Sequence, residues 1–151
     1  MKELLNEIVS KPEGNRSNGE VSIEIINEIE KHLDIVFPEK YKEFLIEYGS
    51  GIIGYIDFFG VKKGLDIFLK TPPNIIYFNE NLRKYGLRKD IIAISYAGDQ
   101  EYFVLNCDLN HQNYGSVYVW NPSLANELIE ELEYISDDII DFVKKAFFEE
   151  L

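Results

Sequence analysis

The chain has 151 residues, of which 27 are acidic and 15 are basic, so its formal net charge is −12. This is the length of one domain, and a chain with 46% hydrophobic residues can bury a core of its own. A strongly negative surface repels the phosphate backbone, so nucleic acid is not the expected partner, whereas a basic protein is attracted. Solubility alone is the other explanation of such a charge.

Cys107 is the single cysteine, which excludes an intramolecular disulfide and fits a reducing compartment. The first residues become polar too early for the apolar segment of a signal peptide. No run approaches the roughly 18 apolar residues that a membrane span needs. We therefore expect a cytoplasmic protein with no membrane partner.

The first third of the chain shows helical periodicity in three places. Apolar residues at helical spacing predict a short helix over residues 4–9 and a longer one over residues 22–33. Between them, residues 11–20 are rich in Pro, Gly, Asn and Ser, which predicts a flexible connector. A third helix is predicted to begin at Pro38 and to end at Gly49.

Glycine and β-forming residues dominate the next part of the chain. Residues 49–60 predict a turn followed by a strand, and residues 65–69 a short further strand. A helix is then expected to open at Thr71 and Pro72 and to stop at Gly86.

Three β-rich runs follow, at residues 91–96, 102–107 and 117–120. Gly98 can supply the positive φ of a tight hairpin between the first two of these runs. The order of helices, clustered strands and a final helix predicts a single α+β domain over residues 1–151, with a central, mostly antiparallel sheet flanked by helices.

The C-terminal part is less clear, because residues 124–135 fit either a helix or irregular structure. Ser136 is expected to cap a terminal helix, with Asp137 and Asp138 in its first turn. Periodicity in all these elements selects twelve expected core residues: Ile25, Ile29, Tyr41, Phe44, Leu45, Tyr48, Ile92, Ile94, Phe103, Leu105, Val117 and Val119.

None of the common nucleotide-binding, metalloprotease or nucleophile-elbow motifs is present. His32 and His111 have no Cys or His at metal-ligand spacing, and Cys107 is expected to be a partly buried strand residue. Five carboxylates could pair for acid–base chemistry, namely Asp57, Asp66, Asp99, Glu101 and Asp108. Turn and surface roles explain these carboxylates better, so we predict no catalytic residue, no metal and no cofactor. A small hydrolase that uses a pair of these carboxylates ranks below the two binding functions described at the end of this section.

The strongest indication of function in the sequence is a concentration of acidic residues near its C-terminal end. Residues 127–150 hold nine carboxylates against Lys144 and Lys145, which indicates either a solvated face or a surface that receives a basic partner. We expect the partner-binding residues to be Glu130, Glu131, Glu133, Asp137, Asp138 and Asp141, with the turn at Asp99 and Glu101 as a second location.

Residues 25–51 carry an ordered set of signature positions. A helical I-x-x-x-E is followed by F-P-x-x-Y-x-x-F-L and a glycine-rich stop, at Ile26, Glu30, Phe37, Pro38, Tyr41, Phe44, Leu45, Gly49 and Gly51. Further matches are I-I-A-I at 91–94, Gly98 with Asp99, Y-F-V-L at 102–105, G-S-V-Y at 115–118, and a closing helix at 138–143. Together they resemble the SUKH superfamily over residues 22–148, with departures at residues 1–20 and in an insert at 60–88.

The SUKH superfamily includes bacterial immunity proteins and fungal cell-wall assembly regulators. The resemblance implies an α+β fold that acts by stoichiometric protein binding, without shared catalytic residues. The expected function is an immunity protein that binds and neutralises a cognate bacterial toxin domain, a basic nuclease, as a monomer or weak homo-oligomer. The alternative is a regulatory scaffold or adaptor of the same fold that binds a cellular protein.

Overall fold

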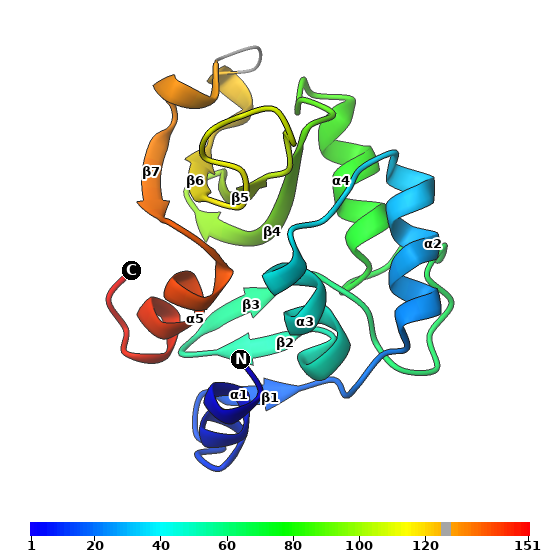
Figure 1. Ribbon diagram of the computed structural model, residues 1–151, viewed down its shortest axis with the longest axis vertical. Helices are drawn as coiled ribbons and strands as arrows, with labels where there is room; N and C mark the ends of the chain where they lie inside the picture. Colours follow the sequence, from blue (N-terminus) through cyan, green and yellow to red (C-terminus); the bar gives the residue numbers. More distant parts are fainter. Residues whose placement is uncertain (125–127) are drawn as a thin grey trace.

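The computed structural model describes residues 1–124 and 128–151 and contains one antiparallel sheet (Figure 1). Its seven strands lie side by side in chain order: β1 (Asn15–Ser17), β2 (Gly51–Ile53), β3 (Ile56–Phe58), β4 (Ile91–Gly98), β5 (Glu101–Asn106), β6 (Val117–Trp120) and β7 (Glu133–Ser136). The α-helices are α1 (Lys2–Val9), α2 (Ile23–Leu33), α3 (Glu39–Tyr48), α4 (Ile75–Arg83) and α5 (Ile139–Phe147), with short 3₁₀ helices at Pro122–Leu124 and Ile129–Glu131. The predicted α+β class with an antiparallel sheet is confirmed.

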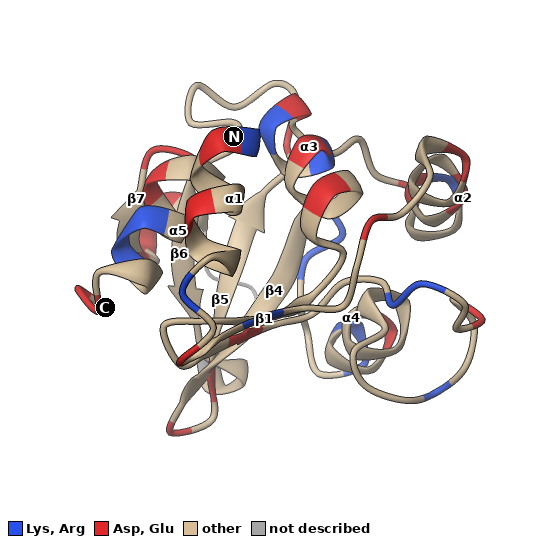
Figure 2. Cartoon of the chain, turned by 90° about the horizontal axis from the view of Figure 1, so that it is seen from below, with Lys and Arg blue, Asp and Glu red and all other residues tan. Residues whose placement is uncertain are grey.

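The core lies between this sheet and the helices that cover it (Figure 2). Phe58 of β3 packs against Phe44 of α3 and Phe142 of α5, with ring centroids 5.1 and 5.7 Å apart. On the other side, Phe59 stacks on Phe78 of α4 at 3.9 Å. Aromatic contacts therefore tie helices to both faces of the sheet.

The expected core residues are confirmed. Ten of the twelve are buried, and the other two, Ile25 and Val119, are partly buried. The helix after Pro38 is also confirmed, since α3 ends at Gly49 with φ 74°. A Cβ at Gly49 would lie 2.4 Å from the carbonyl oxygen of Gly19, so both conformation and space require glycine there.

Two predictions about the strands before residue 60 are wrong. The expected flexible connector contains β1, where Arg16 pairs with Ile52 of β2. Residues 49–60 hold two strands instead of one, because β2 and β3 form a hairpin. Strands of three residues are too short to show a hydrophobic alternation, so their partners and not their own pattern decide them.

Residues 65–69 form turns instead of the expected short strand. The carboxylate of Asp66 accepts the backbone N–H of Phe68 at 3.0 Å, which favours a turn. The side chain of Asn74, the N-cap of α4, donates to the carbonyl oxygens of Asp66 and Leu69 at 2.9 Å each. Helix α4 accordingly begins at Ile75, after these turns, and not at Thr71.

The residue that caps α5 differs from the expected one. Asp138 is the N-cap, and its carboxylate accepts the backbone N–H of Asp141 at 2.8 Å. Ser136 is buried at the end of β7, where its hydroxyl donates to the carbonyl oxygen of Asp138 at 2.9 Å. The ambiguous segment is resolved in its described part, as a 3₁₀ turn at Ile129–Glu131 followed by β7.

Asn79 of α4 completes the pairing of β4. Strand β3 meets β4 at a single pair, Phe58 with Ser95, so the backbone of Ala93 lies beyond the strand neighbour. The Asn79 side chain accepts the N–H of Ala93 at 2.7 Å and donates to its carbonyl oxygen at 3.0 Å. A buried amide therefore replaces a strand here and fixes α4 against the sheet.

Candidate interaction surface and a charged cleft

Strand β7 lies at one edge of the sheet and pairs with β6 (Figures 1 and 2). Acidic side chains and one exposed tyrosine follow this edge into α5, and of the carboxylates all are exposed except Asp141, which is partly exposed. We call this set the β7 edge surface, consisting of Glu131, Glu133, Tyr134, Asp137 and Asp141. Glu127, which belongs to the acidic segment of the sequence, lies outside the described residues.

Tyr134 contacts a carboxylate of this surface. Its side chain is 52% exposed, and its hydroxyl donates a hydrogen bond to Asp137. This hydrogen bond, some burial and the negative charges of Asp137 and Asp141 raise the pKa of Tyr134 to about 12. The phenol resists ionisation chiefly because ionisation would remove the proton that it donates to Asp137, and the neighbouring negative charges add to this effect.

Among the expected partner-binding residues, Asp137 and Asp141 contact residues near them in the chain, Tyr134 and Lys145. Two others are held by residues that are distant in the chain. Asp138 accepts a hydrogen bond from Lys40 of α3 at 2.7 Å in addition to capping α5. Glu130 lies 2.6 Å from Nε2 of His111, and this hydrogen bond lowers the pKa of Glu130. The sequence could not separate these two carboxylates from their exposed neighbours, because both partners are distant in the chain.

Asp99 and Glu101 lie at the β4–β5 hairpin. The sheet register places Glu133 opposite Val119 and Val119 opposite Phe103, which is two residues from Glu101 along β5. The hairpin and Glu133 therefore point toward the same end of the sheet, two strands apart. The acidic residues at the junction of β7 and α5 lie at the other end of β7, so the expected site divides into two groups.

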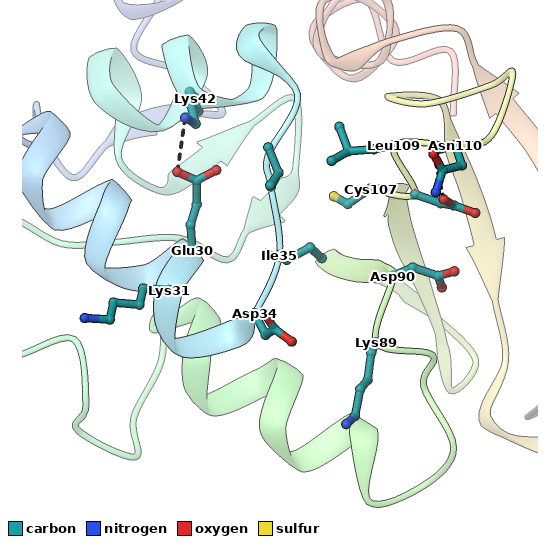
Figure 3. Close-up of a pocket in the computed structure, with 12 residues that line it drawn as sticks. Glu30, Lys31, Asp34, Ile35, Lys42, Lys89, Asp90, Cys107, Leu109 and Asn110 are labelled. Atoms are coloured by element: carbon teal, nitrogen blue, oxygen red, sulfur yellow. Dashed lines mark hydrogen bonds and ion pairs between the residues drawn. The ribbon is translucent and has the colours of Figure 1, made fainter.

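A second feature is a cleft of about 610 Å³ that the sequence analysis did not find (Figure 3). It lies between the end of α2, the start of α3, the α4–β4 loop and the β5–β6 loop, and its charged lining residues are Glu30, Lys31, Asp34, Lys42, Lys89, Asp90 and Asp108. These residues come from four separate segments, so no local motif marks them.

The carboxylates of the cleft are largely used within the chain. Glu30 pairs with Lys42 at 3.1 Å and accepts the backbone N–H of Phe37 at 2.7 Å. Asp90 pairs with Arg88 through two hydrogen bonds of 3.0 and 2.6 Å. Such groups hold the loops of the cleft together, and general acid–base catalysis would need a carboxyl free to exchange its proton.

Cys107 also lines the cleft, and it is buried. Burial, together with the nearby charges of Asp90 and Glu30, raises the pKa of the Cys107 thiol well above its usual value. A nucleophilic cysteine needs the opposite shift, because the thiolate is the reactive form. Cys107 is therefore a packed core residue whose thiol stays protonated.

The remaining candidates for chemistry are separated from one another. His32 contacts Glu80 and His111 contacts Glu130. Among the described residues, no group of three or more His, Cys, Asp or Glu side chains is arranged to hold a metal ion. Asp66 and Asp108 accept backbone N–H groups two residues further on, as in ordinary turns.

Asp138 should contribute to stability in a pH-dependent way. Partial burial alone would raise the pKa of Asp138, but the hydrogen bonds from Lys40 and from the N–H of Asp141 outweigh it, so the pKa is lowered. A lowered folded-state pKa stabilises the protein above the unfolded value near 4, and this contribution is lost as the pH falls through the folded pKa. Asp138→Ala should cost about 1 kcal/mol at neutral pH, measured by urea unfolding, and less at pH 3. Asp138→Asn, which retains a capping side chain, is the control, and an equal cost of Asp138→Ala at both pH values would contradict the assignment.

Comparison with known proteins identifies the family to which this fold belongs. The SUKH_5 family model, described as SMI1-KNR4 cell-wall, matches residues 1–148, including the N-terminal segment that the sequence signatures did not cover. A crystal structure of a protein from Pseudomonas syringae pv. tomato superposes with a TM-score of 0.59 at 21% identity, over 84% of this chain and 88% of that one, and shows the same fold. No curated protein matches the chain, and no helix in the described parts is long and apolar enough to cross a bilayer. The protein belongs to the SUKH family of SMI1-KNR4 domains.

Proposed function

We propose that this chain is an immunity protein that binds a basic bacterial toxin domain, a nuclease, and blocks it stoichiometrically. The observation that carries the proposal is the β7 edge surface, where exposed carboxylates follow an edge strand and one of them, Asp137, accepts a hydrogen bond from the exposed Tyr134. Family membership supports it, because the SUKH superfamily includes immunity proteins. The proposal places the protein in the cytoplasm, where an incoming nuclease would act.

The mechanism needs no catalytic group. A nuclease presents Lys and Arg to the phosphates of its substrate, so a surface with carboxylates in place of phosphates can occupy the same residues. The net charge of −12 accelerates the encounter with a basic domain and repels nucleic acid from the complex. Inhibition then follows from exclusion of the substrate.

Co-expression tests the proposal directly. A candidate nuclease toxin domain, chosen from the genes next to this one, is expressed in a sensitive bacterium with and without this chain, and growth and nucleic-acid integrity are followed. We expect growth to be restored together with a stable one-to-one complex of the purified proteins. Continued killing at equal expression, or a toxin that is inhibited without forming a complex, would rule the proposal out.

A scaffold or adaptor role is the second candidate. The specific observation in its favour is the charged cleft, a concave surface that carries both signs of charge and shares no lining residue with the β7 edge surface. A scaffold holds its partner permanently, so affinity purification from cells that lack the toxin should recover one cellular protein in stoichiometric amount. If no such cellular protein is recovered, the immunity role is favoured.

A further inference from the structure

A hollow of about 670 Å³ opens between the α1–β1 loop, the β2–β3 turn and the end of α5. Its walls carry three aromatic rings from two distant segments, Tyr55 of the turn and Phe147 and Phe148 of the C-terminal helix. Tyr55 is 74% exposed and Phe148 is 59% exposed. We call this feature the Tyr55 hollow.

The backbone at Tyr55 adopts an unfavourable conformation. Gly54 and Tyr55 are the central residues of the β2–β3 hairpin, with φ of 53° and 75°, as a type I′ turn requires. Gly54 fits because a Cβ there would lie 1.8 Å from the carbonyl oxygen of Ala146. Tyr55 is a bulky residue in a region that favours glycine or asparagine. Its ring is largely exposed, so burial within this chain does not offset the strain.

Cations fit these rings. Nζ of Lys11 lies 5.3 Å from the centroid of the Phe147 ring, which is the geometry of a cation–π contact. The rings of Tyr55 and Phe148 carry no such cation among the described residues. Glu13 and Glu149 also line the hollow, so its two carboxylates outnumber its one cation, Lys11, and neither carboxylate forms an ion pair with a described residue.

We propose that the Tyr55 hollow binds an arginine side chain of the basic toxin domain, and the inference rests on the proposed function. A guanidinium stacks on aromatic faces and forms paired hydrogen bonds with carboxylates, whereas a lysine ammonium acts as a point charge. Tyr55 and Phe148 would supply the faces, and Glu13 or Glu149 the carboxylate. Tyrosine and arginine are both enriched among the few residues that dominate the binding energy of a protein interface.

Tyr55→Gly separates binding from folding. Glycine is favoured at positive φ, so the variant should unfold at the same urea concentration as the parent protein or a higher one. Its dissociation from the toxin domain should nevertheless be faster by about 30-fold, and Phe148→Ala should act in the same direction. Tyr85→Ala is the matched control, because Tyr85 is 64% exposed and lies outside the hollow.

The outcomes distinguish the hollow from the proposed function. If the parent chain binds the toxin and Tyr55→Gly binds it equally well, the hollow is not used and the immunity role stands. If the parent chain does not bind the toxin, the proposed function fails. An NMR titration with the peptide Gly-Arg-Gly then tests whether the hollow binds an arginine side chain. Shifts at Tyr55 and Phe148 that exceed those with Gly-Lys-Gly, together with loss of the Phe148 shift in Tyr55→Gly, support it. Shifts spread evenly over the acidic residues overturn it.

Discussion

Replacing Glu131, Glu133 and Asp137 with lysine should slow association with the toxin domain about 100-fold at low ionic strength. The three side chains are exposed on the β7 edge surface, so they contribute to the field that an approaching cation meets. The triple change also removes half of the net charge of −12. Asp138 is left intact because it pairs with Lys40 and caps α5.

The measurement is the association rate at several salt concentrations. Salt shortens the range of the field to roughly 10 Å at 0.1 M and 3 Å at 1 M, so the difference from the parent chain should shrink as salt is added. Glu3, Glu24 and Glu28 are exposed on α1 and α2, and changing them to lysine makes the same change in net charge elsewhere. If this control is slowed equally, overall charge and not the β7 edge surface steers the encounter.

Phe58→Ala should have the largest effect on folding, a loss of about 3–5 kcal/mol in the free energy of unfolding. The Phe58 ring is fully buried and contacts Phe44 of α3 and Phe142 of α5. Truncation would leave a cavity where the sheet and two helices meet. Urea unfolding measures the loss, and Tyr85→Ala should change stability by less than about 0.5 kcal/mol because its side chain is exposed. A loss below about 1 kcal/mol for Phe58→Ala would contradict the packing of α3 and α5 on β3.

Several elements follow from local sequence. Tyr41, Phe44, Leu45 and Tyr48 repeat at the helical period between Pro38 and Gly49, and all four are buried in α3. Strands β4, β5 and β6 are long enough to show their β-forming residues. The signature positions also identify the family before any contact is known. Each of these signals is made of short local patterns, so the chain itself carries them.

Long-range contacts decide the rest. Strand β1 exists because Arg16 meets Ile52, and β7 becomes an edge because it pairs with β6 in a particular register. A short segment carries no sign of its distant partner, and for this reason the sequence predicts a connector where a strand forms.

The candidate sites show the same division between local sequence signals and long-range contacts. By itself, the sequence determined that the protein is acidic, that the acidity concentrates near the C-terminal end, and that the helices and central strands follow their periodicity. Tertiary structure alone decided that Asp138 and Glu130 are held by Lys40 and His111, and that Tyr55 and Phe148 line one hollow. Composition and periodicity are properties of neighbouring residues, whereas free and paired charges differ only in which distant group lies within hydrogen-bonding reach.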